Sequence, residues 1–329
     1  MKTVIITGAS GFIGLNLVEA FLRRGWRVRA LSFDGIPALA AAEFRALPGE
    51  LDDRRGDVRD QSALEALFEG GTPDAVIAGA AITSGAARER DNPSGIFEVN
   101  LLAPVRLLEI AARHNVPRML CFSSTASMGE LPFLGSPVRE TDRPRPLTFY
   151  GTTKGALETV GQRWNSFGAA PRVFVGRLTA ATGPWERATG VRDTLSPPLA
   201  IVESALAGEA IAPLPEGGAR DYAYAPEVAE QVVWLLTAES PAPEHDLYQL
   251  SPGYIWHART MLDALQAEGV PVHIEAGGRR IELHDDLTRQ RSPLLAERIS
   301  AEFRAPPPAT ECARAYVRWA LAHRAWFAR

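Results

Sequence analysis

The chain has 329 residues, of which 46% are hydrophobic and 22% are charged, a composition typical of a globular protein with a sizeable core. Its net charge of −4 and pI of about 5.9 argue against a nucleic-acid or membrane-surface partner, because both require concentrated positive charge. No apolar run approaches the ~20 residues of a membrane span and no signal-peptide pattern precedes the first strand, so we expect a cytoplasmic protein.

The two cysteines and six histidines are scattered along the chain and show no metal-ligand spacing. Cys121 and Cys312 lie in apolar segments, where packing is enough to explain them. We therefore expect neither a disulfide nor a metal.

The first half of the chain alternates short apolar runs with segments of helical periodicity, which is typical of a parallel sheet with crossover helices. Ser62 and Glu65 have the spacing of a capping box, and Pro104 predicts a kink in a long helix. We expect strands at residues 3–7, 27–32, 74–81, 118–124 and 172–178. Between them we expect helices at residues 12–24, 62–69, 94–115 and around Tyr150.

After about residue 183 the alternation gives way to irregular segments and short helices, with an amphipathic helix near the end. We therefore predict an α/β protein with a Rossmann-type, doubly wound parallel sheet and a smaller, interleaved C-terminal substrate domain. The dinucleotide-binding domain is expected at residues 1–182, with segments near 219–252 returning to it. Residues 183–329 are expected to form most of the substrate domain.

The segment TGASGFIG follows the first strand directly and opens the first helix. Glycine suits a tight turn and the close approach of a dinucleotide pyrophosphate, while the helix N-terminus supplies N–H donors. The alternative is a structural turn, but the strand–glycine–helix order favours a dinucleotide site. To this site we assign Gly8, Gly11, Phe12, Ile13, Gly14 and, from the strand at 74–81, Ala80.

The end of the second strand should contact the adenosine ribose, where a carboxylate favours NAD and a basic residue favours NADP. The candidates there are Ser32 and Asp34, and no lysine or arginine follows the strand. We therefore favour NAD over NADP; the alternative is that Asp34 only caps the loop.

Lysine and arginine together number 35, yet only Lys2 and Lys154 are lysines. Lys154 lies four residues after Tyr150, so both side chains share one face of a helix. An adjacent ammonium favours the phenolate, and its compact charge also reaches a ribose hydroxyl that a planar guanidinium would overshoot. The pair predicts a tyrosine acid–base catalyst with a lysine partner; the alternative is an exposed pair without a function.

Ser123, Ser124 and Thr125 follow an apolar run at the carboxyl end of a predicted strand. Open α/β sheets bind ligands at this edge, and a hydroxyl there can polarise a substrate carbonyl. Taken alone these residues suggest an ordinary turn, but beside the two other motifs they become candidates for catalysis.

The segments TGASGFIG, GDVRD, VNLLAP, CFSST, YGTTK and GARDYAYAPEVA together resemble the extended short-chain dehydrogenase/reductase family, in its epimerase–dehydratase branch. The resemblance spans nearly the whole chain. It implies Tyr150 as general acid/base with Lys154 as its partner. It also implies Ser124, or alternatively Thr125, as the hydroxyl that faces the substrate carbonyl.

The same resemblance implies adenine contacts for Asp57 and Val58. It implies that Asn100 belongs to the cofactor site, in a supporting role. Members of the family commonly dimerise through two helices, which here would start near Asn100 and Tyr150, so a homodimer is expected.

Three positions or segments bear on which reaction of the family, and which substrate, to expect. Sugar-nucleotide 4,6-dehydratases carry an Asp-Glu pair after the catalytic hydroxyl, whereas Thr125 and Ala126 stand here, so dehydration is not expected. Ala180 replaces an asparagine that touches the substrate diphosphate in many nucleotide-sugar epimerases. The segment GPWERATG is instead similar to one seen in epimerases of nucleotide-linked uronic acids.

An anionic substrate would suit the arginines of this region, because a guanidinium binds carboxylate or phosphate in a bidentate manner. Arg187, Arg192 and Arg220 are the candidates, and the alternative is that they pair with acids such as Glu186 and Asp221. The expected substrate-binding residues are Thr83, Ser124, Thr125, Trp185, Arg187 and Arg220.

The function favoured by these observations is that of an NAD(P)-dependent oxidoreductase acting on a small polyhydroxylated, acidic, sugar-type substrate. An alternative is a nucleotide-sugar epimerase of the uronic-acid type that uses tightly bound NAD. A third is a non-catalytic module that senses the cofactor. The substrate itself is not readable from these motifs, because the fold alone does not specify it.

Overall fold

The structure, a computed structural model, describes residues 1–190, 195–214, 219–282 and 290–328. A seven-stranded sheet with strand order β10-β6-β5-β4-β1-β2-β3 lies at its centre, and every neighbouring pair in it is parallel. The strands are β1 (Thr3–Thr7), β2 (Arg27–Ser32), β3 (Glu50–Arg55), β4 (Ala75–Ala78), β5 (Arg118–Ser124), β6 (Arg172–Leu178) and β10 (Leu247–Leu250). The predicted doubly wound Rossmann-type sheet is confirmed.

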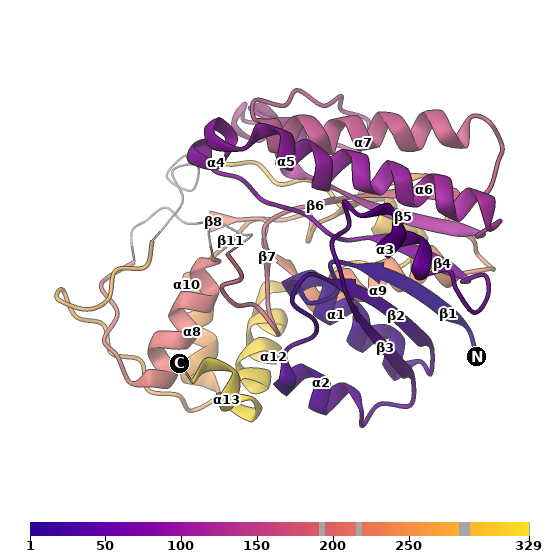
Figure 1. Ribbon diagram of the computed structural model, residues 1–329. Coiled ribbons are helices and arrows are strands. Elements are labelled where there is room, and N and C mark those ends of the chain that lie inside the picture. Colours follow the sequence, from indigo (N-terminus) through magenta and orange to yellow (C-terminus); the bar gives the residue numbers. More distant parts are fainter. Residues whose placement is uncertain (191–194, 215–218, 283–289, 329) are drawn as a thin grey trace.

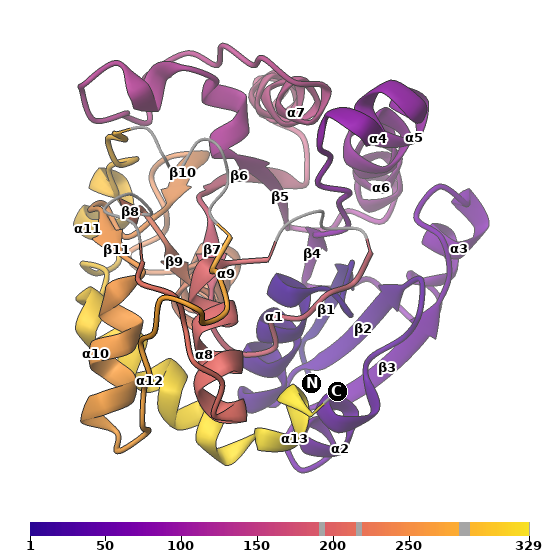
Figure 2. The ribbon, with the colours of Figure 1, turned by 90° about the vertical axis from the view of Figure 1, so that its left-hand side faces the viewer.

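Helices cover both faces of this sheet (Figures 1 and 2). They are α1 (Phe12–Arg23), α2 (Ala38–Phe44), α3 (Gln61–Ala66), α4 (Ala86–Asp91), α5 (Pro93–Phe97), α6 (Ala103–Arg113), α7 (Phe149–Asn165), α9 (Ala225–Thr237) and α11 (Glu297–Glu302). Side chains of a strand alternate between faces, so Val4 and Ile6 join the core under α1 and α9. Ile5 joins the core under α3 and α6. Burial on both sides explains why the central strands are continuously apolar.

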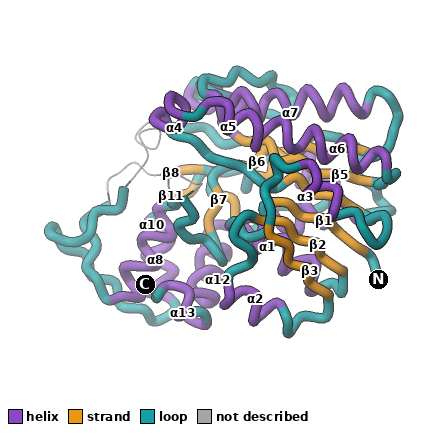
Figure 3. The backbone as a smooth tube through the Cα atoms, viewed as in Figure 1, coloured by secondary structure: helices purple, strands orange, loops and turns teal. Residues whose placement is uncertain are grey.

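A second, smaller group of elements packs beside the sheet (Figure 3). It contains α8 (Pro197–Ala207), α10 (Arg259–Ala267), α12 (Ala309–Ala322), α13 (Arg324–Phe327) and the strand pair β8 (Ala219–Arg220) with β11 (Trp256–His257). These helices share a core that includes Ile201, Met261 and Tyr316. A short pair, β7 (Ala181–Thr182) with β9 (Ala223–Tyr224), links the two groups of elements. No helix within the described ranges is long and apolar enough to cross a membrane.

The sequence patterns missed the edge strand β3 and the helix α2. The strand reads ELDDRR and is half-exposed, so it lacks the apolar signal of a central strand. The capping box was also placed wrongly. Asp60, and not Ser62, is the N-cap of α3, and its side chain accepts the Ser62 N–H.

The long helix expected at residues 94–115 is divided into α5, a π-helical turn at Glu98–Leu102, and α6. Pro104 explains the irregularity, because proline lacks the N–H that would bond the carbonyl of Asn100, four residues earlier. The predicted kink is therefore present as a widened turn, and Asn100 lies in it.

Candidate active site

The glycine-rich loop lies where the strand order reverses, between β1 and β4. Gly8 has a φ of +70°, and a Cβ placed on it would lie 2.6 Å from the main chain of Ala80. Only glycine permits this approach of the two loops. A main chain without side chains, at the point where the strand order reverses, allows a dinucleotide to approach closely. The residues present therefore fit the predicted cofactor.

Helix α1 begins directly after this loop, and Gly11 at its N-cap supplies no side-chain cap. A pyrophosphate placed there would meet main-chain N–H donors and the positive end of the helix dipole. The ring of Phe12 is buried against Ala181 and Ala225, with Ile13 packed beside them, so Phe12 offers only its main chain to a ligand.

Tyr150 and Lys154 lie on one face of α7, whose N-cap residue Thr148 accepts a hydrogen bond from the Gly151 N–H. The Lys154 Nζ is 5.6 Å from the centroid of the Tyr150 ring. It donates a 3.0 Å hydrogen bond to the carbonyl oxygen of Phe122, in β5. The lysine is therefore held beside the tyrosine by the sheet beneath it.

Lys154 is 3% exposed. Burial lowers its pKa to about 8, because an ammonium loses its hydration in the interior. At pH 7 the side chain is still mainly charged, so it favours the phenolate form of Tyr150.

Ser124 ends β5 and is half-buried, and its Oγ accepts a 3.2 Å hydrogen bond from the Ala126 N–H. Thr125 is 6% exposed and donates its hydroxyl to the carbonyl of Leu178 at 3.3 Å. Of the two predicted hydroxyls, Ser124 is therefore the one better placed to face a substrate.

A buried network that sequence reasoning missed lies behind these residues. The Glu158 carboxylate accepts hydrogen bonds from Ser123 (2.7 Å), Ser127 (3.0 Å) and Arg177 (2.7 and 2.9 Å). Glu158 and Arg177 are both 2% exposed. The network fixes the end of β5 to α7. A signal was present, because Tyr150, Lys154 and Glu158 are spaced by four along one helix face.

Asn100 was assigned to the cofactor site in a supporting role, and the structure places it beneath the loop that follows β4. It is fully buried, its Oδ1 accepts the Ile82 N–H at 2.8 Å, and its Nδ2 donates to the Ile82 carbonyl at 2.9 Å. Its amide therefore holds the loop after β4, and its role in the cofactor site stays a prediction. Thr83, the next residue of that loop, is half-buried. The loop continues into α4, where the Glu89 carboxylate accepts the N–H of Tyr150 at 3.0 Å.

The residues expected near adenosine lie after β2 and β3. Ser32 is the last residue of β2 and is buried, whereas Asp34 beyond it is exposed. Val58 is buried in the α3–α6 core. Hydrogen bonds from Arg59 hold the pKa of Asp57 below its usual value. The predicted adenine contacts of Asp57 and Val58 stay predictions.

Trp185 does not face a substrate, contrary to expectation. It is 1% exposed and packs edge-on against Trp319 and Trp326, with ring centroids 4.9 and 5.1 Å away. Its Nε1 donates a 2.7 Å hydrogen bond to Glu19 in α1. Trp185 therefore joins α1 to the last helices of the chain.

Arg187 was expected to bind substrate, but the structure places it beside the glycine-rich loop. It donates a 3.3 Å hydrogen bond to the carbonyl of Ser10, and the charge of Asp34 acts on it. Glu186 accepts hydrogen bonds from the start of α8 instead of pairing with Arg187. Arg192 lies outside the described residues.

Arg220 lies in β8, next to the fully buried Asp221. The Asp221 carboxylate binds the Nε of Arg291 at 3.2 Å and the Leu294 N–H at 3.0 Å. The Arg291 guanidinium lies 5.5 Å from the ring of Phe133, in the segment that follows Ser124 along the chain. Arg291 was not selected from the sequence. It joins Asp221, beside β8, to the segment that follows Ser124 and contains Phe133.

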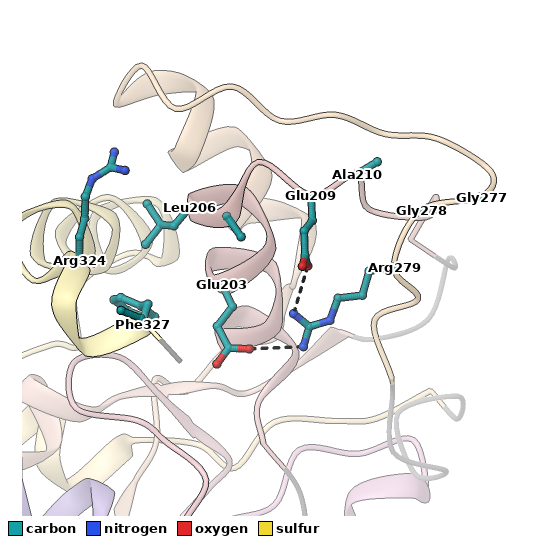
Figure 4. Close-up of a pocket in the computed structure, with 11 residues that line it drawn as sticks. Glu203, Leu206, Glu209, Ala210, Gly277, Gly278, Arg279, Arg324 and Phe327 are labelled. Atoms are coloured by element: carbon teal, nitrogen blue, oxygen red, sulfur yellow. Dashed lines mark hydrogen bonds and ion pairs between the residues drawn. The ribbon is translucent and has the colours of Figure 1, made fainter.

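A groove lined by α8, α13 and residues 277–279 holds none of the predicted site residues (Figure 4). Its Arg279 contacts Glu203 at 3.3 Å and Glu209 at 3.8 Å, so the positive charge is already balanced. Among the described residues, Glu244, His245 and Glu302 also lie close together. A 2.6 Å contact between His245 and Glu302 accounts for that cluster without a metal.

Comparison with known proteins supports this picture. Over 167 residues the chain is 30% identical to a UDP-glucose 4-epimerase of Pisum sativum, covering 49% of this chain and 47% of the relative, so it spans about half the length of the first curated relatives it matches. It is 26% identical to the UDP-glucose 4-epimerase of a Neisseria meningitidis serogroup A strain, over 85% of this chain and 86% of the relative.

Among solved structures, the UDP-glucose 4-epimerase of Thermus thermophilus in complex with NAD superimposes with a TM-score of 0.72 and 25% identity, covering 96% of this chain and 98% of that one. The model of the NAD dependent epimerase/dehydratase family matches residues 4–250. This match covers well over half of the chain and confirms the resemblance: the chain is an enzyme of the extended short-chain dehydrogenase/reductase type and belongs to the NAD dependent epimerase/dehydratase family.

Proposed function

We propose that this chain is an epimerase of a nucleotide-linked sugar that uses bound NAD. The observation that carries the proposal is the set of Tyr150 and Lys154 on α7 and Ser124 at the end of β5, the strand to which Lys154 is hydrogen-bonded, in a chain similar along 85% of its length to a UDP-glucose 4-epimerase. This reverses the order of the two enzymatic functions suggested by the sequence, where an NAD(P)-dependent oxidoreductase of a small polyhydroxylated, acidic, sugar-type substrate came first.

The chemistry needs a group that removes one proton and later returns it. A bound NAD would supply the acceptor, and afterwards the donor, for the hydride of the same carbon. Tyr150 is placed to remove the hydroxyl proton, since the Lys154 ammonium 5.6 Å from its ring favours the phenolate. Ser124 orients the substrate oxygen and stabilises negative charge on it.

The surroundings of Ser124 favour epimerisation over water elimination. Elimination needs a further acid and base beside the hydroxyl. Thr125, the next residue, has its hydroxyl bound to the main chain of β6, and Ala126 carries no functional group. Proton transfer at one oxygen is therefore the reaction that these side chains support.

The arginines of the second group of elements suit a diphosphate. Arg220 precedes Asp221 in the chain, and Arg291 forms an ion pair with the Asp221 carboxylate. A nucleotide-linked substrate brings two phosphate charges, which guanidinium groups bind in a bidentate manner. Ala180 replaces an asparagine that contacts the diphosphate in many nucleotide-sugar epimerases, and Arg220 is the residue that we propose to contact the diphosphate instead.

The test offers purified protein UDP-glucose, UDP-galactose and the corresponding UDP-uronates, beside the free sugar acids. We expect one UDP-sugar pair to interconvert, with no net change of nicotinamide absorbance. Tyr150→Phe serves as the inactive control. Net reduction of the cofactor, or turnover of a free sugar acid alone, would contradict the epimerase proposal and favour a dehydrogenase.

A further inference from the structure

The acid–base tyrosine is held through its main chain by a residue from a distant segment. Tyr150 is the second residue of α7, so its N–H is one of the first donors of the helix, for which no carbonyl of the same helix is available. Thr148, the N-cap, accepts the N–H of Gly151 at 2.9 Å. The N–H of Tyr150 is instead accepted by the carboxylate of Glu89, 61 residues earlier in the chain.

Glu89 is half-buried on α4 and binds two partners through one oxygen atom. Its Oε1 accepts the Tyr150 N–H at 3.0 Å and the Ser84 hydroxyl at 3.3 Å. Helix α7 has no acidic residue of its own in its first turn, where negative charge is favourable because of the helix dipole. Glu89 therefore supplies, from another helix, the charge and the acceptor that the first turn of α7 lacks.

The other side of the same main chain is also fixed. Thr153 is fully buried and donates its hydroxyl to the Tyr150 carbonyl at 2.7 Å. Side chains thus bind the groups on both sides of the Tyr150 Cα, and these groups determine where its Cα–Cβ bond points. A group that transfers a proton must be held to within about 0.5 Å of its working position. The Glu89 contact is one of the two that set this position through the main chain.

The Glu89 carboxylate also fixes the loop that follows β4. Asn100 binds the main chain of Ile82 at one point of this loop, and Glu89 binds Ser84 at another. Thr83, which was predicted to contact the substrate, lies between these two fixed residues. The Glu89 Oε1 therefore joins the loop that carries Thr83 directly to the first turn of α7.

Helix α4 has further attachments that hold Glu89 in place. Arg88 donates a 2.9 Å hydrogen bond to the carbonyl of Gly190, in the segment that follows β7. Successive residues of a helix point about 100° apart, so Arg88 and Glu89 contact different neighbours. After α4, the Asn92 side chain accepts the Gly95 N–H and caps α5. A helix held at several points is a suitable support for a residue that positions another.

We propose that Glu89 is a positioning residue for the acid–base tyrosine. Its carboxylate fixes the first turn of α7 against the loop after β4, so that the Tyr150 hydroxyl and Thr83 meet the same substrate. This inference rests on the catalytic role proposed for Tyr150. In this role Glu89 exchanges no proton with the substrate, because its Oε1 is bound to the Tyr150 N–H and to Ser84.

The proposal is tested by the kinetics of Glu89→Ala and Glu89→Gln with UDP-glucose and UDP-galactose. Alanine leaves the Tyr150 N–H without its acceptor, so kcat should fall about tenfold to a hundredfold while KM changes less than about threefold. Glutamine keeps an acceptor oxygen of the same reach and should retain at least about a third of kcat. Asp91→Ala is the matched control and should change neither constant, because Asp91 is exposed on the same helix and pairs with its neighbour Arg90.

The result is separable from that of the epimerase proposal. Failure of the epimerase proposal appears in the unmodified protein, whereas failure of this inference appears in the ratio of variant to unmodified protein. If the unmodified protein reduces its cofactor with a free sugar acid instead, the same ratios are measured on that reaction, because Tyr150 removes a hydroxyl proton in both.

Hydrogen exchange followed by mass spectrometry gives a readout that needs no substrate. The peptide that contains the Tyr150 amide should exchange faster in Glu89→Ala, because this N–H has lost its acceptor. The same peptide should be unchanged in Glu89→Gln and in Asp91→Ala.

Four outcomes overturn the proposal. A kcat of Glu89→Ala within about threefold of the unmodified protein would mean that Tyr150 does not depend on this contact. A rise in KM alone would assign Glu89 to substrate binding. An equal loss of kcat in Glu89→Gln would show that the charge, and not the position of the acceptor, is what matters. Unchanged exchange in Glu89→Ala would mean that another group holds the first turn of α7.

Discussion

The two ends of the cofactor site are built in opposite ways. At the catalytic end the buried polar groups bind one another: Glu158 accepts hydrogen bonds from Ser123, Ser127 and Arg177, and Lys154 donates to the main chain of β5. At the adenosine end, Ser32 and Arg187 keep buried atoms without partners among the described residues.

This difference separates groups that serve chemistry from groups that serve recognition. A catalytic centre gains from atoms that are already fixed before the substrate arrives. A binding site gains affinity when the ligand completes hydrogen bonds that the free protein leaves unmade. Substitutions at the catalytic end should therefore alter rate or folding, except at Lys154, which is also expected to contact the cofactor ribose, whereas substitutions at the adenosine end should alter affinity.

The largest effect is expected for Tyr150→Phe. Loss of the acid–base hydroxyl should lower turnover by about 10²- to 10⁴-fold, while the cofactor affinity changes less than about threefold. Single-turnover kinetics and calorimetry on the same sample measure both. A matching loss of cofactor affinity would mean that the two ends of the site are not separable.

Glu158→Ala probes the preassembled network. Removal of the carboxylate leaves the buried Arg177 without its partner and should lower the free energy of unfolding by about 3–5 kcal/mol. Glu65→Ala is the control, because the Glu65–Arg113 pair is about half-exposed and should contribute less than about 1 kcal/mol. Urea titration of both variants measures the two free energies of unfolding. Similar losses of free energy in the two variants would contradict the role given to the network.

Arg220→Ala tests recognition on the substrate side. A bidentate contact to phosphate is worth roughly 1.5–3 kcal/mol, so KM for the UDP-sugar should rise about tenfold to a hundredfold with a smaller change in kcat. Arg220→Lys should restore part of the affinity. If Arg220→Ala instead lowers the melting temperature with an unchanged KM, the arginine serves folding alone.

The smallest effect is expected from pH. The lowered pKa of Lys154, about 8, means that the ammonium is lost as pH rises through 8, so affinity for the cofactor should fall about tenfold between pH 7 and pH 9. Lys154→Arg keeps its charge across this range and should bind more weakly but without the pH dependence. A flat affinity profile for the unmodified protein would show that the lysine stays charged.

Much of the catalytic end was predictable from the sequence, because its residues are close together in the chain. Four-residue spacing on one helix identifies Tyr150 and Lys154, and the glycine pattern follows a strand directly. The same spacing extends to Glu158, but this signal was overlooked, because a charged residue on a helix is usually solvated. The parallel sheet was predictable from buried apolar strands, whereas the charged edge strand β3 was not.

The adenosine end was beyond such reasoning, because it combines residues from three separate segments. The pairing of Arg55 with Ser32 depends on the register of an unpredicted strand. The position of Arg187 depends on the path of the segment after β6, and this also explains why Trp185 is buried. Local sequence gives the identity of a side chain, but not which distant loop it completes.

Because Trp185 is buried against the C-terminal helices, the position of the neighbouring Arg187 depends on those helices. The main chain between Trp185 and Arg187 is held by the Trp326 Nε1, which donates to the Glu186 carbonyl at 3.0 Å. Trp185 itself packs on Trp319 and Trp326. Helices α12 and α13 thus support the segment that carries Arg187, which lies more than a hundred residues earlier in the chain. Substitutions that destabilise these last helices, although they lie far along the chain from Tyr150, should lower the affinity for the nucleotide first.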